Sequence, residues 1–154
     1  MPQLSRRFLL IATGALALGG VGTFGASWFN VSASNVGTTV LDPAMAHRAA
    51  QDGQILLIDI RRPDEWTKTG LGQGAVPLDM RRADFAQALI ALAEGDRARP
   101  IALICARGVR SRRLGSALAE AGFTRILDVP EGMLGSGAGP GWVNRGLPVV
   151  PWQS

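Results

Sequence analysis

The sequence predicts an α/β fold with a mainly parallel central sheet flanked by helices. The run 55–60, apolar except for Asp59, and the apolar run 101–104 are typical of strands that are covered on both faces, and 124–129 is expected to be a third strand. The segments 82–93 and 111–120 carry apolar residues at the spacing of one helix face. Buried strands that alternate with amphipathic helices are typical of an α/β domain, and a length of 154 residues favours one such domain.

Residues 1–33 are expected to be a signal peptide or a membrane anchor. The apolar stretch 8–18 follows Arg6 and Arg7, and it is typical of the core of a signal peptide behind its positive flank. The segment 5–10 (SRRFLL) resembles the twin-arginine export motif, and that export route would carry a folded domain.

Two fates of this leader are open. The small residues 31–33 suit a cleavage site, and the glycines before them weaken the segment as a permanent membrane helix. The apolar stretch is nevertheless long enough to span a bilayer with tilt, so an uncleaved anchor is the alternative. We expect the domain to be exported to the periplasm, either free or attached to the inner membrane by its N-terminus.

The charge balance argues against nucleic-acid binding. Of the 16 basic residues, two lie in the leader, so the remaining 14 exceed the 12 acidic residues by only two. The arginines are scattered in pairs among aspartates, with no basic stripe and no interleaved aromatic residues. The single histidine, His47, has no recognisable partner, and neither a metal nor a cofactor is expected.

Residues 34–40 are expected to link the leader to a domain that spans 41–152. Asp42 and Pro43 are typical of a helix start, so a helix is predicted to about Ala50. The first buried strand follows this helix.

Less regular structure is expected on either side of the helix 82–93. After the first strand, 62–65 is predicted to be a turn, and 70–77 to be irregular around a short strand at Ala75 and Val76. Gly122 is expected to end the last helix. The glycine- and proline-rich tail, 131–154, is predicted to wrap the domain as a loop.

Cys105 is predicted to be the reactive group. It is the only cysteine and the first residue after a buried strand, where ligands of open parallel sheets bind. The backbone amides that open the next helix, together with the helix dipole, should stabilise its thiolate. Gly108 allows the positive φ that a tight curl needs, and Arg107 and Arg110 add positive charge. The residues predicted to bind substrate are Ala106, Arg107, Gly108, Val109, Arg110 and Ser111.

The length of this loop distinguishes two kinds of chemistry. Cysteine phosphatases and arsenate reductases use a Cys-x5-Arg loop, which holds a tetrahedral phosphate. Here Cys105 and Arg110 form Cys-x4-Arg, and the smaller loop favours an outer sulfur atom on the cysteine. A phosphatase-like enzyme remains the weaker alternative.

From about Val40 to Pro151 the chain resembles a single rhodanese domain, the sulfurtransferase fold. Leu71, Gly72 and Gln73 depart from the family's usual His-Ile-Pro, and the tail is longer and richer in glycine than usual. The resemblance rests on four segments in order, LLIDIRRPDEW (56–66), TGLGQGAVPL (69–78), ICARGVRS (104–111) and EGMLGSGAGPGWVNRGLPV (131–149).

The resemblance implies a three-layer fold and a ping-pong sulfurtransferase. The Cys105 thiolate would take sulfane sulfur from a donor such as thiosulfate, become a persulfide, and pass the sulfur to cyanide, a small thiol or a thiol protein. Arg110 would hold the loop and the donor, Arg107 would attract the donor from the rim, and Asp59 and Arg61 would brace the site. The alternative is a non-catalytic sulfur carrier or protein-binding module.

Overall fold

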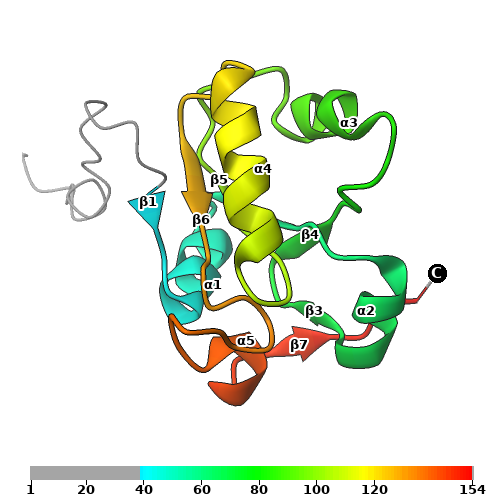
Figure 1. The fold of residues 1–154 in the computed structure, drawn as a ribbon, viewed down its shortest axis with the longest axis vertical. Coiled ribbons are helices and arrows are strands. Elements are labelled where there is room, and N and C mark those ends of the chain that lie inside the picture. The colour runs from blue at the N-terminus through cyan, green and yellow to red at the C-terminus, as the bar shows by residue number, and fades with distance from the viewer. Residues whose placement is uncertain (1–38, 154) are drawn as a thin grey trace, which may run out of the picture. The chain divides into compact units, whose positions relative to one another are not determined.

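The computed structural model describes residues 39–153 (Figure 1). The leader 1–33 and most of the linker predicted after it lie outside this part of the chain. Within 39–153, no helix is both long and apolar enough to cross a membrane.

A five-stranded, all-parallel sheet forms the centre of the domain. Its strand order is β1-β6-β5-β2-β4. This confirms the predicted α/β fold class. The strands are β1 (Thr39–Val40), β2 (Leu56–Asp59), β4 (Ala75–Pro77), β5 (Ile101–Ile104) and β6 (Ile126–Asp128).

Three helices cover the sheet, and Figure 1 shows α4 running alongside β6. They are α1 (Pro43–Gln51), α3 (Phe85–Leu92) and α4 (Val109–Glu120). Because successive side chains of a strand point to opposite faces, α3 and α4 pack on alternate residues of β2 and β5. The apolar cluster on that face includes Ile58, Leu103, Phe85, Leu89 and Leu118.

The start of the sheet corrects the predicted linker 34–40, because its last two residues form β1. Thr39 and Val40 pair in parallel with Leu127 and Asp128 of β6. Two residues are too few to show the alternation of apolar and polar residues that predicts a strand. The pairing depends on the exposed edge of β6 and on no local pattern.

A helix, α2 (Pro63–Thr69), stands where a turn was predicted. Pro63 opens it, and the Glu65 carboxylate accepts a hydrogen bond from the backbone N–H of Arg62 at 3.0 Å. Trp66 buries its side chain against the domain. Proline and acidic residues are common at the first turn of a helix as well as in turns, so the local sequence fits both. The burial of Trp66 stabilises the helical alternative.

The segments predicted to be irregular contain a second, two-stranded antiparallel sheet. It pairs β3 (Leu71–Gly72) with β7 (Val149–Val150). A short helix, α5 (Gly141–Asn144), precedes β7 and places Trp142 against Gly72, where an added Cβ would lie 2.7 Å from the indole ring. The tail therefore does wrap the domain, but it contains regular elements rather than loop alone.

Candidate functional site

Cys105 lies at the carboxyl edge of the sheet, directly after the central strand β5. Asp59 of β2 and Ile104 of β5 are register partners, so the residues that follow both strands meet at one edge. The Cys105 side chain is 1% exposed. The sulfur is therefore buried beneath the loop that leads into α4.

The loop turns back on the sulfur at Gly108. The backbone N–H of Gly108 donates a hydrogen bond to Cys105 Sγ at 3.1 Å. Gly108 has a φ of +80°, and a Cβ on it would lie 2.1 Å from the Pro130 carbonyl oxygen. Only glycine combines this left-handed conformation with so close a backbone contact.

The helix begins at Val109, two residues earlier than predicted, so Ser111 is its third residue. Ser111 is fully buried in the first turn of α4, with its Oγ 3.6 Å from Cys105 Sγ and 3.2 Å from the Gly108 carbonyl oxygen. Val109 points outward and is 57% exposed, and Ala106 is half-buried. The predicted substrate-binding residues thus divide into an inner group around the sulfur and an outer rim.

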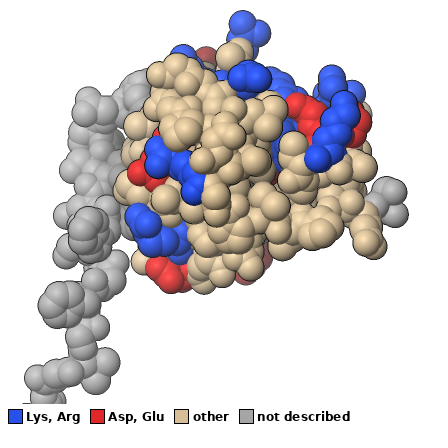
Figure 2. Space-filling view, turned by 90° about the horizontal axis from the view of Figure 1, so that it is seen from below, with Lys and Arg blue, Asp and Glu red and all other residues tan. Residues whose placement is uncertain are grey.

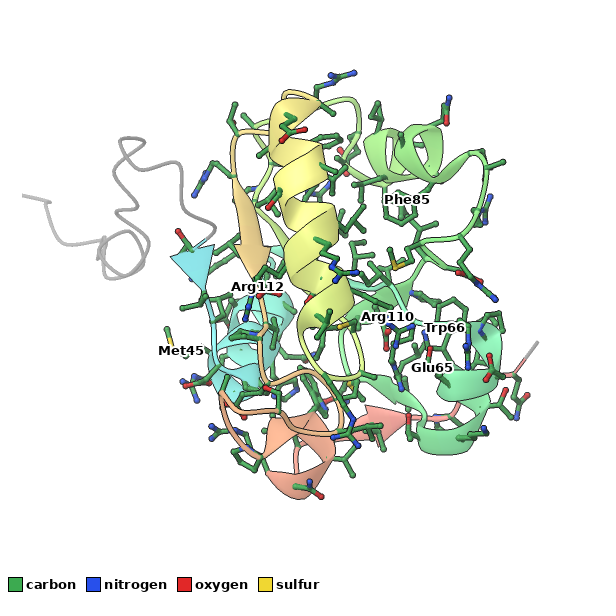
Figure 3. All side chains as sticks on the ribbon, viewed as in Figure 1. Met45, Glu65, Trp66, Phe85, Arg110 and Arg112 are labelled. Atoms are coloured by element: carbon green, nitrogen blue, oxygen red, sulfur yellow. The ribbon has the colours of Figure 1, made fainter. Side chains whose placement is uncertain are left out.

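Arg110 forms a bidentate ion pair with Glu65 of α2, with N–O distances of 2.6 and 2.8 Å (Figure 3). Hydrogen bonding to Arg110 holds the pKa of Glu65 below its ordinary value, and the pKa of Arg110 is raised for the same reason. Glu65 was not among the residues predicted to form the site, so this link was missed. The available signal was that an acid after β2 and an arginine after β5 must share an edge of a parallel sheet.

Arg107 lies on the rim and is exposed. Its guanidinium donates to the Gly135 carbonyl oxygen at 3.3 Å. In the part of the chain that the structure describes, no carboxylate lies within ion-pair distance of it. Its charge is therefore available to an incoming anion, unlike that of Arg110.

Many other arginines are neutralised locally. Figure 2 shows basic side chains beside acidic ones in separate small groups, with no continuous basic patch on that face. Three such pairs join an arginine to an aspartate two positions away, Arg62–Asp64, Arg81–Asp79 and Arg82–Asp84.

Asp59 and Arg61 form a fully buried ion pair beside the site. Arg61 Nη2 lies 2.7 Å from the Asp59 carboxylate, and both side chains are almost completely excluded from solvent. Arg61 also donates to Thr69 Oγ1 at 2.7 Å and to the Gly70 carbonyl oxygen at 2.8 Å. The pair joins the end of β2 to the end of α2, as predicted for residues that brace the site. Both charged groups are bound to each other.

The start of the tail lies along the active loop, a contact that the sequence did not reveal. The backbone N–H of Met133 donates to the Cys105 carbonyl oxygen at 2.9 Å, and that of Leu134 donates to Ala106 at 2.9 Å. A Cβ on Gly132 would lie 2.5 Å from the Ala106 carbonyl oxygen. The glycines of this segment therefore permit backbone packing against the loop.

One buried acid near the site was also missed. Asp128, the last residue of β6, is 2% exposed, and its Oδ1 has no hydrogen-bond partner among the described residues. Burial raises the pKa of Asp128 above its ordinary value. Its position at the end of a predicted strand was visible in the sequence, but its burial was not.

His47 takes part in packing away from these contacts. Its Nε2 lies 3.2 Å from Gln73 Oε1, and its ring meets the Trp142 ring edge-on with 5.5 Å between centroids. Residues 39–153 bring together no group of three side chains suited to hold a metal ion.

Comparison with known proteins agrees with this geometry. The family model of the rhodanese-like domain matches residues 42–135. A sulfurtransferase of Allochromatium vinosum is 28% identical over 107 residues, which cover 70% of this chain and 89% of that protein.

Two solved structures extend the comparison to three dimensions. The polysulfide-sulfur transferase homodimer from Wolinella succinogenes is 26% identical with a TM-score of 0.58, over 75% of this chain and 80% of that one. The thiosulfate sulfurtransferase from Pseudomonas aeruginosa shares the fold, at 19% identity and a TM-score of 0.57, over 76% of this chain and 21% of that one. The predicted family is confirmed: this chain belongs to the family of rhodanese-like domains.

Proposed function

We propose that this protein is a sulfurtransferase in which Cys105 carries the transferred sulfur as a persulfide. The observation that carries the proposal is the hydrogen bond of 3.1 Å from the Gly108 N–H to a buried cysteine sulfur at the carboxyl edge of the sheet. The matched family and the sulfurtransferase relatives support the same assignment.

The reaction follows from the position of the sulfur. The Cys105 thiolate attacks the outer sulfur of a sulfane donor such as thiosulfate, the sulfur–sulfur bond of the donor breaks, and sulfite leaves with the bonding electron pair. The persulfide keeps the negative charge of the thiolate. The Gly108 amide donates to Cys105 Sγ and is placed to stabilise the sulfur anion, and the Ser111 hydroxyl lies 3.6 Å from the same sulfur. An acceptor thiolate or cyanide then attacks the outer sulfur and regenerates the thiolate.

The loop favours this chemistry over phosphoryl transfer. The Cys-x4-Arg loop is one residue shorter than the Cys-x5-Arg loop of phosphatases, and Arg110 is already bound through two hydrogen bonds to Glu65. In our proposal Arg110 fixes the loop and the unpaired Arg107 attracts the anionic donor. Thiosulfate and polysulfide are the two donors to compare, since the Wolinella protein is described as a polysulfide-sulfur transferase.

Two measurements on the purified full-length protein test the function. Thiosulfate and cyanide should yield thiocyanate in the native protein and none in Cys105→Ser, while Ser116→Ala, an exposed serine on α4, should retain activity. Mass spectrometry after donor treatment should show the mass of one added sulfur atom on the native chain alone. Sulfur loading without turnover would favour the carrier alternative, and Cys105-dependent hydrolysis of a phosphate ester would favour the phosphatase.

We also propose that the domain acts after export, on the basis of the arginine pair and apolar stretch of the leader. Replacement of Arg6 and Arg7 by lysine should retain the protein in the cytoplasm. Mass spectrometry of the exported N-terminus should show a start near Ser34 for a cleaved leader, or an intact start for an anchor. Unchanged export of the lysine variant would exclude the twin-arginine route.

A further inference from the structure

Glu131 is a buried acid in the tail that the sulfur-transfer reaction above does not use. The residue is 4% exposed. Its carboxylate accepts hydrogen bonds from Arg145 Nη2 at 2.6 Å and Arg145 Nε at 2.8 Å, and from the backbone N–H of Gly141 at 2.9 Å. Charge-assisted hydrogen bonds of this bidentate kind fix the geometry of both partners. The segment 131–145 therefore folds around this one side chain.

Residues 135–141 form a turn, the tail turn, that packs on this carboxylate. A Cβ on Gly139 would lie 2.5 Å from the Glu131 carboxyl carbon. The Gly139 carbonyl oxygen also accepts a hydrogen bond from the Ser136 N–H at 2.9 Å, which closes the turn. Gly137 has nothing within 4 Å of an added Cβ. The tail turn thus has one side against Glu131 and one open side.

The tail turn binds the Arg107 side chain. A Cβ on Gly141 would lie 2.2 Å from the backbone nitrogen of Gly135, so the two ends of the turn are in close backbone contact. The Gly135 carbonyl oxygen accepts a hydrogen bond from Arg107 Nη1 at 3.3 Å. Glu131 therefore supports, through one backbone contact, the oxygen to which Arg107 donates.

The reactive sulfur is held by other bonds. The Met133 and Leu134 amides donate to the carbonyl oxygens of the active loop at 2.9 Å. The Gly108 amide donates to the sulfur at 3.1 Å. None of these three bonds involves the Glu131 side chain. A change at Glu131 should therefore displace the Arg107 guanidinium more than it displaces the sulfur.

We propose that Glu131 is a positioning residue that holds the Arg107 guanidinium on the rim of the site, where it attracts anionic sulfur donors. Arg107 is exposed, and among the described residues no carboxylate lies within ion-pair distance of it. Its charge is therefore available to a donor as long as the tail turn keeps it in place. The role deepens the proposed function and rests on it for the identity of the anion.

The sign of the effect separates positioning from simple charge. Glu131→Gln removes a negative charge and leaves Arg145 without its partner, so charge alone would favour an anion at the site. Loss of the Arg107 position would disfavour the anion. The two explanations thus predict opposite changes in the same variant.

The test is alkylation of Cys105 by iodoacetate, an anion, and by iodoacetamide, its neutral counterpart, in the full-length protein at one pH and low salt. Both reagents react with the same thiolate and release iodide, so the ratio of the iodoacetate rate to the iodoacetamide rate does not depend on the fraction of thiolate. Arg107→Gln should lower this ratio by at least about threefold. Glu131→Gln should lower it by a similar factor, and the double variant should fall no further than Arg107→Gln alone.

Two controls match these variants. Glu94→Gln removes the same charge from an exposed ion pair with Arg99, and it should leave the ratio at or above the native value. Gly139→Ala presses a methyl group on the Glu131 carboxylate without changing any charge, and it should lower the ratio. Gly137→Ala, in the open part of the same turn, should keep the native ratio.

A ratio in Glu131→Gln that equals or exceeds the native ratio would overturn the proposal. A native ratio in Arg107→Gln would do the same, as would a further fall in the double variant, because Glu131 would then act by another route. If Glu131→Gln does not fold, the two glycine variants decide, and equal ratios in them overturn the proposal.

The positioning role and the proposed function can fail separately, because alkylation needs no sulfur transfer. Thiocyanate formation with a ratio that Glu131→Gln does not lower would refute the role of Glu131 and leave the sulfurtransferase intact. The expected ratios in a protein that takes up no sulfur would do the reverse.

Discussion

Glu65 and Arg110, 45 positions apart in the chain, join α2 to the first turn of α4 through two hydrogen bonds of 2.6 and 2.8 Å. The ion pair holds the loop around Cys105 against the neighbouring helix. Because both side chains are partly exposed, we expect Glu65→Gln to lower the free energy of unfolding by only about 1 kcal/mol at neutral pH. Loosening the loop should also slow persulfide formation.

The pH dependence of this effect has a definite sign. Arg110 lowers the pKa of Glu65 from its ordinary value of 4.5, so the stabilisation is complete above that value and is lost as the pH falls through the lower pKa of the folded state. Urea unfolding should therefore show a difference between native and Glu65→Gln proteins at pH values above about 5 that shrinks in acid. Glu94→Gln, in an exposed pair with Arg99, should show no such difference.

The parts of the fold that local periodicity carries could be predicted from the sequence. The runs 55–60 and 101–104 became β2 and β5, because strands covered on both faces are mainly apolar. Helix α4 followed from its apolar stripe, and its start two residues before the predicted one makes Ser111 the third residue of the helix. The location of Cys105 followed from the rule for ligand sites in parallel sheets.

The remaining features depend on contacts between distant segments. Strand β1 forms because the edge of β6 is free to pair with it. Strand β3 pairs with β7, which lies far away in the sequence, in the tail. The partner of Arg110 and the burial of Asp128 likewise depend on how α2 and α4 meet the sheet. No local pattern encodes these contacts. The pairing of Glu65 with Arg110 could still have been predicted from topology, because the residues that follow β2 and β5 meet at the same edge of the sheet.

Gly108 should tolerate no side chain. A Cβ there would meet the Pro130 carbonyl oxygen at 2.1 Å, in a backbone conformation that other residues rarely adopt. Gly53 has a similar φ of +67° but nothing within 4 Å of an added Cβ. Gly53→Ala should thus cost about 1 kcal/mol in unfolding free energy from strain alone, and Gly108→Ala should cost clearly more.

The two glycine variants also differ in their expected activity. Gly108→Ala should abolish sulfur loading of Cys105, since the clash displaces the amide that donates to its sulfur, whereas Gly53→Ala should load normally. Mass spectrometry after thiosulfate treatment measures this directly. Equal loading and equal stability in both variants would contradict the placement of the loop against Pro130.

Asp59 should be essential to stability because its partner is buried. Asp59→Asn leaves the Arg61 guanidinium without a counter-charge in the interior, so we expect it to lower the unfolding free energy by about 3 kcal/mol or more. Asp64→Asn breaks an Arg–Asp pair of the same two-residue spacing on the surface, and it should have no measurable effect. Urea unfolding of both variants gives the comparison, and a similar loss in both would show that burial of the Asp59–Arg61 pair is not what matters.

Arg107 should act on the encounter with the donor and not on the chemical step. Its charge is unpaired on the rim, so Arg107→Gln should raise the KM for thiosulfate severalfold and leave kcat nearly unchanged. Added salt should shrink the difference, because it screens an exposed charge. Arg125→Gln is the control, since Arg125 is exposed and precedes β6 at the opposite edge of the sheet. An equal rise in KM for both variants would indicate a general effect of net charge, and a fall in kcat for Arg107→Gln alone would assign that side chain to the reaction itself.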